Sequence, residues 1–530
     1  MSTAAGVPRR AVALRLAPAI FGALAAIAFP PFGFLPGLLG YGLLMRSLDA
    51  AAPHAPLRSA FWRGWLGGFF FFLIATWWVF EAFQVDAANQ GWMAPFAVAL
   101  LAAGLGLFWG IGGLAYRWIG PKGPARALVF AGVFCLAEWL RGHLLTGFPW
   151  DLPGEAWRAG SAPSQAASVF GAYGLSLITV AAAAALCLVL DRDDRRASRL
   201  AAGIGALVVI ALYGLGDARL AHPAPADPTA PVVRVVQPNE PEQPSYDLAA
   251  LHAIVDRYAA LTARPPAPGK PWPQVIVWPE GAIPDSANDY LAPDSWTRAE
   301  LETALRPGQS LLDGAYRIQP SVGGPLYFNT LIALRQTAGG LVQTGAYDKY
   351  RLVPFGEYMP LDGLMARLGV KKLVHVGDGF SSGPRSSPIA PDGVPRLQAL
   401  ICYESLFPGL ARESPGGRAR WIVNVSDDAW FGRTYGPLQH LNLASYRAIE
   451  EGLPIVRATP TGVSAVVDAY GRVVPGALLG QGAMGVIDAA LPPALPPTVF
   501  SRFGESPFWI LTLLSLAVTF IDRRRVARAS

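Results

Sequence analysis

The sequence predicts a membrane-embedded bundle of α-helices joined to an α/β domain, and two observations carry this prediction. Apolar residues make up 52% of the 530 residues and charged residues only 15%, with a mean hydropathy of +0.33. Soluble proteins carry nearer ~25% charge, so much of this chain is expected to face lipid. Long apolar segments dominate the chain before residue 220, whereas strand and helix patterns alternate between about 220 and 500.

The apolar segments predict eight membrane spans. A helix needs ~20 apolar residues to cross the hydrocarbon core, and the candidates lie at about 12–29, 33–48, 61–83, 92–117, 126–143, 163–190, 200–217 and 506–521. The second is short and rich in glycine and proline. Clusters of arginine and lysine at 9–10, 46–63, 117–126, 191–199 and 522–528 all fall on one side of an eight-span arrangement. Since cytoplasmic loops are basic, both chain ends are predicted to be cytoplasmic.

This topology predicts three regions: a transmembrane domain of seven spans at 1–219, an outer domain at 220–500, and a final transmembrane helix with a cytoplasmic tail at 501–530. No small-residue cleavage site follows the first apolar run, so a cleaved signal peptide is not predicted. In a bacterium the outer domain would be periplasmic, on a multi-pass protein of the inner membrane.

The outer domain alternates strand and helix patterns. Short apolar runs indicate strands and helical spacing of apolar residues indicates helices. Strands are predicted at 231–239, 274–282, 310–318, 328–336, 397–405 and 419–432, with a strand pair over 454–474, and helices at 247–263 and 439–452. Several strands with intervening helices imply a layered α/β sandwich.

Cysteine and charge usage exclude several function classes. Of three cysteines, Cys135 and Cys187 lie inside long apolar runs and only Cys402 does not, so neither a disulfide framework nor a zinc site is predicted. We expect no metal and no cofactor. The net charge of +6 could suggest nucleic acid, but the arginines flank apolar segments. Membrane topology explains them better, and no nucleic-acid partner is predicted.

Three ionisable residues each follow an apolar run: Glu280, Lys349 and Cys402. Residues at strand ends can converge in α/β folds although they are distant in sequence. A thiol with an ordinary pKa of ~8.5 is a weak nucleophile until a carboxylate removes its proton. An ammonium favours the thiolate and, with the N–H of Tyr403, can stabilise the oxyanion formed on attack of a carbonyl. This set is sufficient for acyl transfer through a thioester.

Each of these residues alone has a plainer interpretation. Cys402 could be a small buried hydrophobe, Glu280 a turn residue after proline, and Lys349 a solvated surface lysine. All three residues stand at the ends of apolar runs, which argues against three unrelated structural roles. Spacing alone does not prove that the three side chains converge.

The motifs around these residues resemble a known family. The segments "VIVWPEGAIP", "YDKYRLVPFGEYMP" and "ICYESLFP" resemble the glutamate, lysine and cysteine motifs of the nitrilase superfamily. Together with the eight spans, "TGFPW", "SDDAWFG" and "GPLQHLNLASYRAIE", they make nearly the whole chain similar to the apolipoprotein N-acyltransferase family. This resemblance implies a nitrilase-like α-β-β-α sandwich on the membrane bundle.

The resemblance also implies residue roles. Glu280 would be the general base, Lys349 the oxyanion-stabilising lysine and Cys402 the nucleophile. Matching positions with supporting or substrate roles are Glu357, Tyr403, Glu404, Asn329 and Tyr246.

Three positions depart from the family pattern. Tyr246 stands where a tryptophan is common, and Asp427 and Pro460 stand where asparagine is usual. These departures concern substrate contacts and leave the triad intact.

The reaction implied by the resemblance has two steps. A phospholipid donates its sn-1 acyl chain to the cysteine, and the acyl group then passes to the α-amino group of the N-terminal diacylglyceryl-cysteine of an apolipoprotein. The expected partners are therefore the phospholipid donor, the lipid-modified apolipoprotein acceptor and the membrane lipid, with a monomeric enzyme. The segment 359–376 mixes apolar residues with two lysines, which suits a doorway for acyl chains at the interface as well as a packed surface helix.

Two other functions are compatible with parts of the sequence. A membrane-bound nitrilase-type amide hydrolase would use the same triad, with water rather than an amine resolving the thioester. A transporter or scaffold would need no triad, but the spans contain few charges beyond Glu138 and Arg141.

Overall fold

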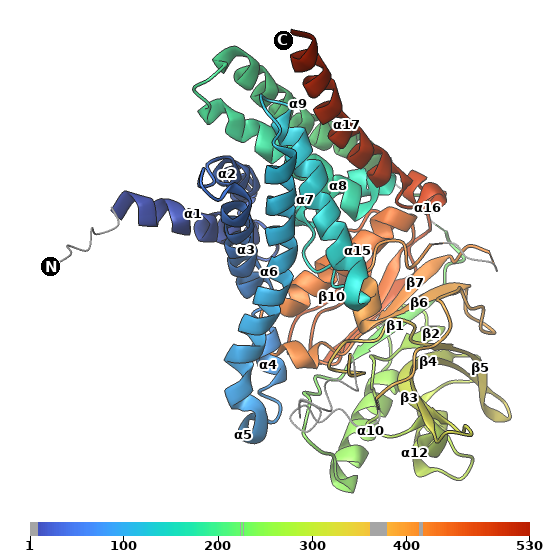
Figure 1. The fold of residues 1–530 in the computed structure, drawn as a ribbon. Coiled ribbons are helices and arrows are strands. Elements are labelled where there is room, and N and C mark those ends of the chain that lie inside the picture. The colour runs from blue at the N-terminus through green and yellow to red at the C-terminus, as the bar shows by residue number, and fades with distance from the viewer. Residues whose placement is uncertain (1–8, 223, 226, 361–378, 413–416, 530) are drawn as a thin grey trace. The chain divides into compact units, whose positions relative to one another are not determined.

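The computed structural model describes residues 9–222, 224–225, 227–360, 379–412 and 417–529 (Figure 1). The chain divides into two compact units, one formed by residues 1–222 with 503–530 and the other by residues 223–502. Most of the doorway segment predicted at 359–376 lies outside the described residues.

The first unit is helical. Four of its described segments are long and apolar enough to cross a membrane: Ala87–Ile119, Arg126–Thr146, Pro163–Leu190 and Arg195–Leu220. Two shorter apolar helices cover Arg15–Ala26 and Ser506–Val518. The arrangement of eight spans therefore stays a prediction. The helices are α1 (Arg9–Ala26), α2 (Leu39–Asp49), α3 (Pro56–Ala75), α4 (Val79–Ala82), α5 (Ala87–Gln90), α6 (Ala94–Ile119), α7 (Arg126–His143), α8 (Ala167–Cys187), α9 (Arg195–Leu220) and α17 (Ser506–Ala529).

The segment predicted as a span at 33–48 is divided in the structure. A 3-10 turn at Leu35–Leu38 precedes α2, which has 11 residues. Proline within the turn lacks the N–H that a longer α-helix would need. The α-helical part is thus shorter than the ~20 residues of a straight membrane crossing.

Small residues let α3 and α6 pack at backbone distance. A Cβ added at Gly64 would lie 2.4 Å from the carbonyl oxygen of Trp109, and one added at Gly68 would lie 2.9 Å from the Cα of Gly106. Close backbone approach through small residues is the usual way in which membrane helices associate.

The second unit contains two sheets. The six-stranded sheet has the order β11-β1-β2-β3-β4-β5 and the five-stranded sheet the order β10-β9-β8-β7-β6. Strands β1 to β3 run parallel, as do β6 to β8. The strands are β1 (Val232–Gln237), β2 (Val275–Val277), β3 (Ser310–Gln319), β4 (Leu326–Thr337), β5 (Gly340–Asp348), β6 (Leu397–Ile401), β7 (Trp421–Val425), β8 (Ile455–Ala458), β9 (Ser464–Val467), β10 (Val473–Leu479) and β11 (Gly485–Ala490).

Alternating side chains hold the two sheets face to face. In β2, Val275 and Val277 join the core between the sheets, whereas Ile276 joins the core under the helices. In β6, Ala399 lies between the sheets and Leu400 faces the opposite layer. Both faces of β2 and of β6 are therefore apolar, as expected for buried parallel strands.

Helices cover the outer faces of both sheets. Ile254 and Tyr258 of α10 pack on the six-stranded sheet, and Leu441 and Ala448 of α15 pack on the five-stranded sheet. The result is the layered α/β sandwich that the sequence predicts, with helix, sheet, sheet and helix in succession. The helices of this unit are α10 (Leu248–Ala263), α11 (Ala287–Tyr290), α12 (Trp296–Ala304) and α15 (Gly436–Glu451), and α16 (Val499–Phe503) follows them.

Two features of the sheets differ from the sequence prediction. The region 454–474, predicted as one strand pair, contributes to three strands, β8, β9 and β10. Strand β11 was not predicted. It pairs antiparallel with β1, and Arg234 of β1 donates to Asp488 of β11 at 2.7 Å. This pairing joins segments more than 200 residues apart, which local patterns do not reveal.

Candidate active site

Cys402 occupies a strained turn at the end of β6. The 3-10 turn Cys402–Leu406 begins directly after the strand, and Cys402 has φ +47°. A non-glycine residue in this left-handed region costs about 1 kcal/mol or more, so it persists only where its surroundings hold it. The contacts of the neighbouring residues supply that support.

Glu404 ties the cysteine turn to the lysine loop. Its Oε2 accepts from Ile401 N–H at 2.8 Å, and its Oε1 accepts from Tyr350 N–H at 2.9 Å and Arg351 N–H at 3.1 Å. The Tyr347 hydroxyl also donates to Oε1 at 2.7 Å. Burial raises the pKa of Glu404 above its usual value, and the hydrogen bonds from Ile401, Tyr347 and Arg351 act in the opposite direction. One buried carboxylate thus fixes the backbone on both sides of the site.

Lys349 follows β5 directly and its side chain is only 1% exposed. Its Nζ lies 3.0 Å from Glu280 Oε1 and 2.9 Å from Glu357 Oε1. Burial would lower the pKa of this lysine, but the two carboxylates outweigh burial and raise it above its ordinary value. The side chain is therefore a buried ammonium rather than a solvated surface lysine.

Asn329 links the two glutamates. Its Nδ2 donates to Oε1 of Glu280 and to Oε1 of Glu357, at 2.7 Å each. Glu280 Oε2 also accepts from Asp427 N–H at 2.8 Å, and Glu357 Oε2 from Val353 N–H at 2.7 Å. Both carboxylates are thus held in place by backbone and by Asn329.

The charges around Cys402 determine the protonation states of the thiol and of the base Glu280. Burial opposes ionisation of Glu280, but the Lys349 ammonium and the hydrogen bonds outweigh it and keep the pKa of Glu280 below its usual value. Burial and the Glu280 carboxylate raise the pKa of the Cys402 thiol, and Lys349 acts in the opposite direction. The resting site therefore holds a neutral thiol beside an ionised base and an ammonium, and the three groups interact electrostatically.

A second buried cluster lies behind the cysteine turn. His440 Nδ1 lies 3.0 Å from Asp428 Oδ1, and His440 Nε2 lies 2.9 Å from Ser405 Oγ and 3.3 Å from the carbonyl oxygen of Cys402. Arg457 Nη2 donates to both Asp428 oxygens, at 2.8 and 2.7 Å. The side chains of His440, Asp428 and Arg457 are at most 1% exposed. Asp428 and His440 lie in the segments "SDDAWFG" and "GPLQHLNLASYRAIE" that carry the family resemblance, but no role was predicted for them or for Arg457.

This cluster fixes the carbonyl of Cys402. Burial and Arg457 lower the pKa of His440, so its ring is neutral. Nε2 of the ring lies 3.3 Å from this carbonyl oxygen, and Nδ1 lies 3.0 Å from both Asp428 Oδ1 and Arg457 Nη2. Ser405 Oγ donates to the same carbonyl at 2.8 Å. Since the peptide is planar and trans, anchoring this C=O also sets the direction of the Tyr403 N–H.

A small cavity of about 20 Å³ adjoins Glu280, and Tyr246, Asp427 and Pro460 all line it. These are the three positions that depart from the family pattern. Glu242 lies beside Asp427, and burial together with this second carboxyl raises the pKa of Asp427 well above its usual value. The Tyr246 hydroxyl donates to Glu242 at 3.4 Å. The departures therefore form one connected wall next to the base.

The structure brings the predicted residues into one place, and it contains no competing metal arrangement in the described part of the chain. Lys349 and Asn329 each contact both Glu280 and Glu357, and Glu404 braces the loop that follows Lys349. Among the described residues, no group of three or more His, Cys, Asp or Glu side chains could hold a metal ion.

Comparisons with known proteins match both parts of the chain. A carbon-nitrogen hydrolase family model matches residues 232–495, and a model of the apolipoprotein N-acyltransferase N-terminal domain matches residues 21–185. An apolipoprotein N-acyltransferase of Caulobacter vibrioides is 52% identical over 512 residues, which cover 96% of this chain and 94% of the relative. One of Allorhizobium ampelinum is 36% identical over 511 residues, covering 95% and 94%. Among solved structures, an amidase from Nesterenkonia sp. is 17% identical with a TM-score of 0.34, covering 54% of this chain and 97% of the amidase.

Proposed function

Because the chain belongs to the apolipoprotein N-acyltransferase family, we propose that Glu280, Lys349 and Cys402 are its catalytic triad and that the reaction passes through a thioester on Cys402. The protein is an N-acyltransferase of the nitrilase superfamily, with a phospholipid donor and an apolipoprotein acceptor.

In the first half-reaction the phospholipid ester acylates the thiol. Glu280 removes the thiol proton as sulfur attacks the carbonyl carbon. The tetrahedral oxyanion is stabilised by the Lys349 ammonium and by the Tyr403 N–H. The intermediate then collapses, Glu280 returns its proton to the departing oxygen, and lysophospholipid leaves.

In the second half-reaction a neutral α-amino group attacks the thioester carbonyl. Glu280 accepts the proton from the attacking nitrogen, and the same two donors stabilise the oxyanion. The C–S bond breaks, the thiolate leaves, and the proton returns from Glu280 to sulfur. The product is an amide, and the enzyme regains its resting state.

Glu357 has a supporting role in this proposal. It contacts Lys349 Nζ at 2.9 Å and shares Asn329 Nδ2 with Glu280. It therefore keeps the lysine charged while Glu280 alternates between its ionised and protonated forms. With only one carboxylate, the ammonium would lose its counter-charge whenever the base holds a proton.

The location of the catalytic unit follows from charge and chain topology. Four described helices suit a membrane protein, and the predicted basic loops favour eight spans with both ends in the cytoplasm. This arrangement puts residues 220–500 on the periplasmic side of the inner membrane. We place the donor and acceptor lipids in the outer leaflet next to that unit.

One observation carries the proposal: the Lys349 ammonium, 1% exposed, lies between two carboxylates and acts on the Cys402 thiol. The test incubates the full-length protein with phospholipid and searches for an acyl adduct on Cys402 by mass spectrometry. We expect the adduct in the wild type and its disappearance as transferable thioester in Cys402→Ser, Lys349→Ala and Glu280→Ala. Adding a diacylglyceryl-cysteine peptide should discharge it.

The controls separate acyl transfer from the rejected alternatives. Release of ammonia from small amides, without an acyl adduct, would instead support a hydrolase. Lipoprotein maturation by a folded Cys402→Ala variant would contradict any catalytic role for the thiol. Unfolding temperatures of all variants should be compared with that of the wild type.

A further inference from the structure

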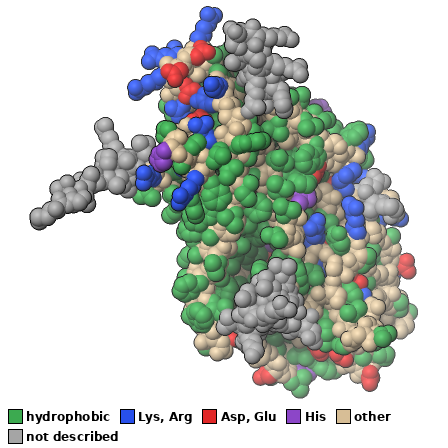
Figure 2. Space-filling model, in the orientation of Figure 1, with side chains coloured by type: hydrophobic (Ala, Val, Ile, Leu, Met, Phe, Trp, Pro, Cys, Tyr) green, Lys and Arg blue, Asp and Glu red, His purple; other side chains and the backbone are tan. Residues whose placement is uncertain are grey.

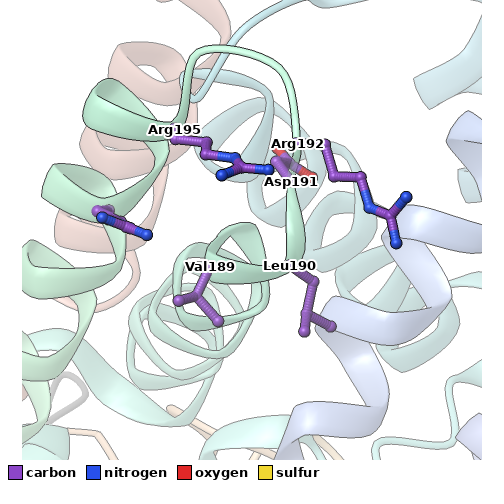
Figure 3. Close-up of a pocket in the computed structure, with 6 residues that line it drawn as sticks. Val189, Leu190, Asp191, Arg192 and Arg195 are labelled. Atoms are coloured by element: carbon purple, nitrogen blue, oxygen red, sulfur yellow. The ribbon is translucent and has the colours of Figure 1, made fainter.

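A cavity of about 200 Å³ opens where α8 leads into α9 (Figure 3). This volume is several times the ~30 Å³ that one water occupies in the liquid, so it has room for a phosphate group. The short segment 191–194 joins the two helices there, and both lie in segments of membrane-spanning length. The lining residues are Val189, Leu190, Asp191, Arg192, Arg195 and Arg199.

Asp191, the one acidic residue that lines the cavity, is already engaged. Asp191 is bound by Arg46 through Oδ1 and by Arg126 through Oδ2, the latter at 2.6 Å. Asp194 caps α9, where it accepts from Ala197 N–H at 3.3 Å. The one carboxylate that lines the cavity is thus neutralised by two arginines from other helices.

The three arginines of the cavity lack such partners. Within the described part of the chain, no carboxylate forms an ion pair with Arg192, Arg195 or Arg199. Figure 3 shows Arg195 reaching from the first turn of α9 toward Asp191 and Arg192. A cavity lined by three unpaired guanidinium groups attracts an anion, and arginine suits phosphate because its donors can bind two oxygens at once.

Apolar surface continues from the same cavity. Val189 and Leu190 are 57% and 54% exposed, and Leu200, Ile204 and Leu207 on α9 are 67%, 54% and 63% exposed. Figure 2 shows arginine and lysine side chains, with acidic side chains among them, gathered at one end of the helical unit next to a largely hydrophobic surface. The combination matches an amphiphile whose anionic head lies among the arginines and whose chains follow α9.

We infer that this cavity binds the phosphate group of an anionic glycerophospholipid at the membrane surface. The guanidinium groups of Arg192, Arg195 and Arg199 hold the phosphate oxygens, while Val189 and the exposed residues of α9 contact the acyl chains. A net anionic head group is favoured over a zwitterionic one, because no acidic side chain is left in the cavity to receive an ammonium. Basic sites between membrane helices are a common form of lipid recognition.

The test measures binding of fluorescent phosphatidylglycerol to the full-length protein in neutral detergent. Each arginine near an anionic lipid contributes about fivefold in affinity, so Arg195→Gln should bind about fivefold more weakly. A double variant with Arg199→Gln should bind about 25-fold more weakly. Arg196→Gln is the matched control, because this exposed arginine lies in the same turn of α9 but does not line the cavity. It should bind within about twofold of the wild type.

Three outcomes would overturn the inference. The first is equal binding by the double variant and the wild type. The second is an equal loss in Arg196→Gln, which would indicate diffuse attraction rather than a site. The third is competition by inorganic phosphate as effective as that by phosphatidylglycerol, which would indicate a site for free anions.

Lipid binding in the cavity must be distinguished from lipid binding near Cys402. Any phospholipid bound near Cys402 contributes equally in all these variants, so the difference between Arg195→Gln and Arg196→Gln isolates the cavity. The acyl adduct on Cys402 should still form in Arg195→Gln. If the double variant does not fold, the single variant decides.

Discussion

Replacing His440 tests how the oxyanion donor is oriented. His440→Asn can keep the contact of Nδ1 with Asp428 and Arg457 but cannot reach the Cys402 carbonyl, whereas His440→Gln can place its amide nitrogen near the position of Nε2. In the wild type, Nε2 lies 3.3 Å from that carbonyl and Ser405 Oγ lies 2.8 Å from it. The first variant therefore releases one of two anchors on the peptide that carries the Tyr403 N–H.

The expected loss of rate in His440→Asn follows from the contacts that the variant keeps. Removing an oxyanion donor outright costs about 10²–10³ in rate. Here Ser405 still donates to the carbonyl and Lys349 still supplies charge, so His440→Asn should slow thioester formation by about 10- to 100-fold. This corresponds to about 1.4–2.7 kcal/mol of transition-state stabilisation. His440→Gln should recover most of the loss.

Two reactions of the same thiol provide the assay. Acylation by phospholipid passes through an oxyanion, whereas alkylation by iodoacetamide displaces iodide at a saturated carbon and forms none. Both rates would be followed by mass spectrometry of Cys402 at one pH. We expect His440→Asn to slow acylation and to leave alkylation within about threefold.

Equal slowing of both reactions would refute this reasoning, since it would indicate a general disturbance of the thiol. Unchanged acylation in a folded His440→Asn variant would refute it as well. The two variants should have similar unfolding temperatures, so that stability does not explain a difference between them.

Three other substitutions test the electrostatics of the catalytic unit. Glu404→Gln leaves a buried N–H donor without an acceptor, which should lower the free energy of unfolding by about 1–3 kcal/mol and slow adduct formation. Burial raises the pKa of Asp313 to about 6, so the folded chain binds the proton more tightly than the unfolded chain. Wild-type stability should then fall by up to about 3 kcal/mol as pH rises from about 4 through 6, and Asp313→Asn should remove this slope. Asp427→Asn keeps the oxygen that accepts from Ala429 N–H and removes a carboxyl of raised pKa, so the variant should lose less stability than the wild type as pH rises above about 4.

These predictions are tested by unfolding the full chain in detergent at several pH values, with tryptophan fluorescence as the signal. A pH slope that survives in Asp313→Asn would show that another group causes it. Wild-type stability in Glu404→Gln would contradict the bracing role of this carboxylate. A loss of stability with rising pH that is as large in Asp427→Asn as in the wild type would contradict the assignment to Asp427.

The layered fold was predictable because its strands are short apolar runs. The segments around Val277 and Ile401 are apolar on both faces, as strands covered by a second sheet and by helices must be. Pairing of β11 with β1 was not predictable, because it depends on Arg234 meeting Asp488 across most of the unit. The division before α2 was visible only as a glycine- and proline-rich stretch.

The residues of the candidate site that follow apolar runs were predictable from the sequence. The residues that position them through buried contacts were not. Glu280, Lys349 and Cys402 stand at such positions, and their motifs carried the family resemblance. Burial of Lys349 could not be derived, since it depends on Glu357 and Asn329 from other segments. His440 and Arg457 lie within a helix and a strand, where a lone polar residue gives no local sign that it faces a buried carboxylate.

The contacts of Glu404 carry a consequence for assembly. This carboxylate binds backbone next to Lys349, which ends a strand of one sheet, and next to Cys402, which ends a strand of the other. The Lys349 ammonium and the Cys402 thiol therefore lie next to each other only after the two sheets have packed together. A chain with only one half complete therefore has the cysteine without the base and the ammonium that the thioester reaction needs.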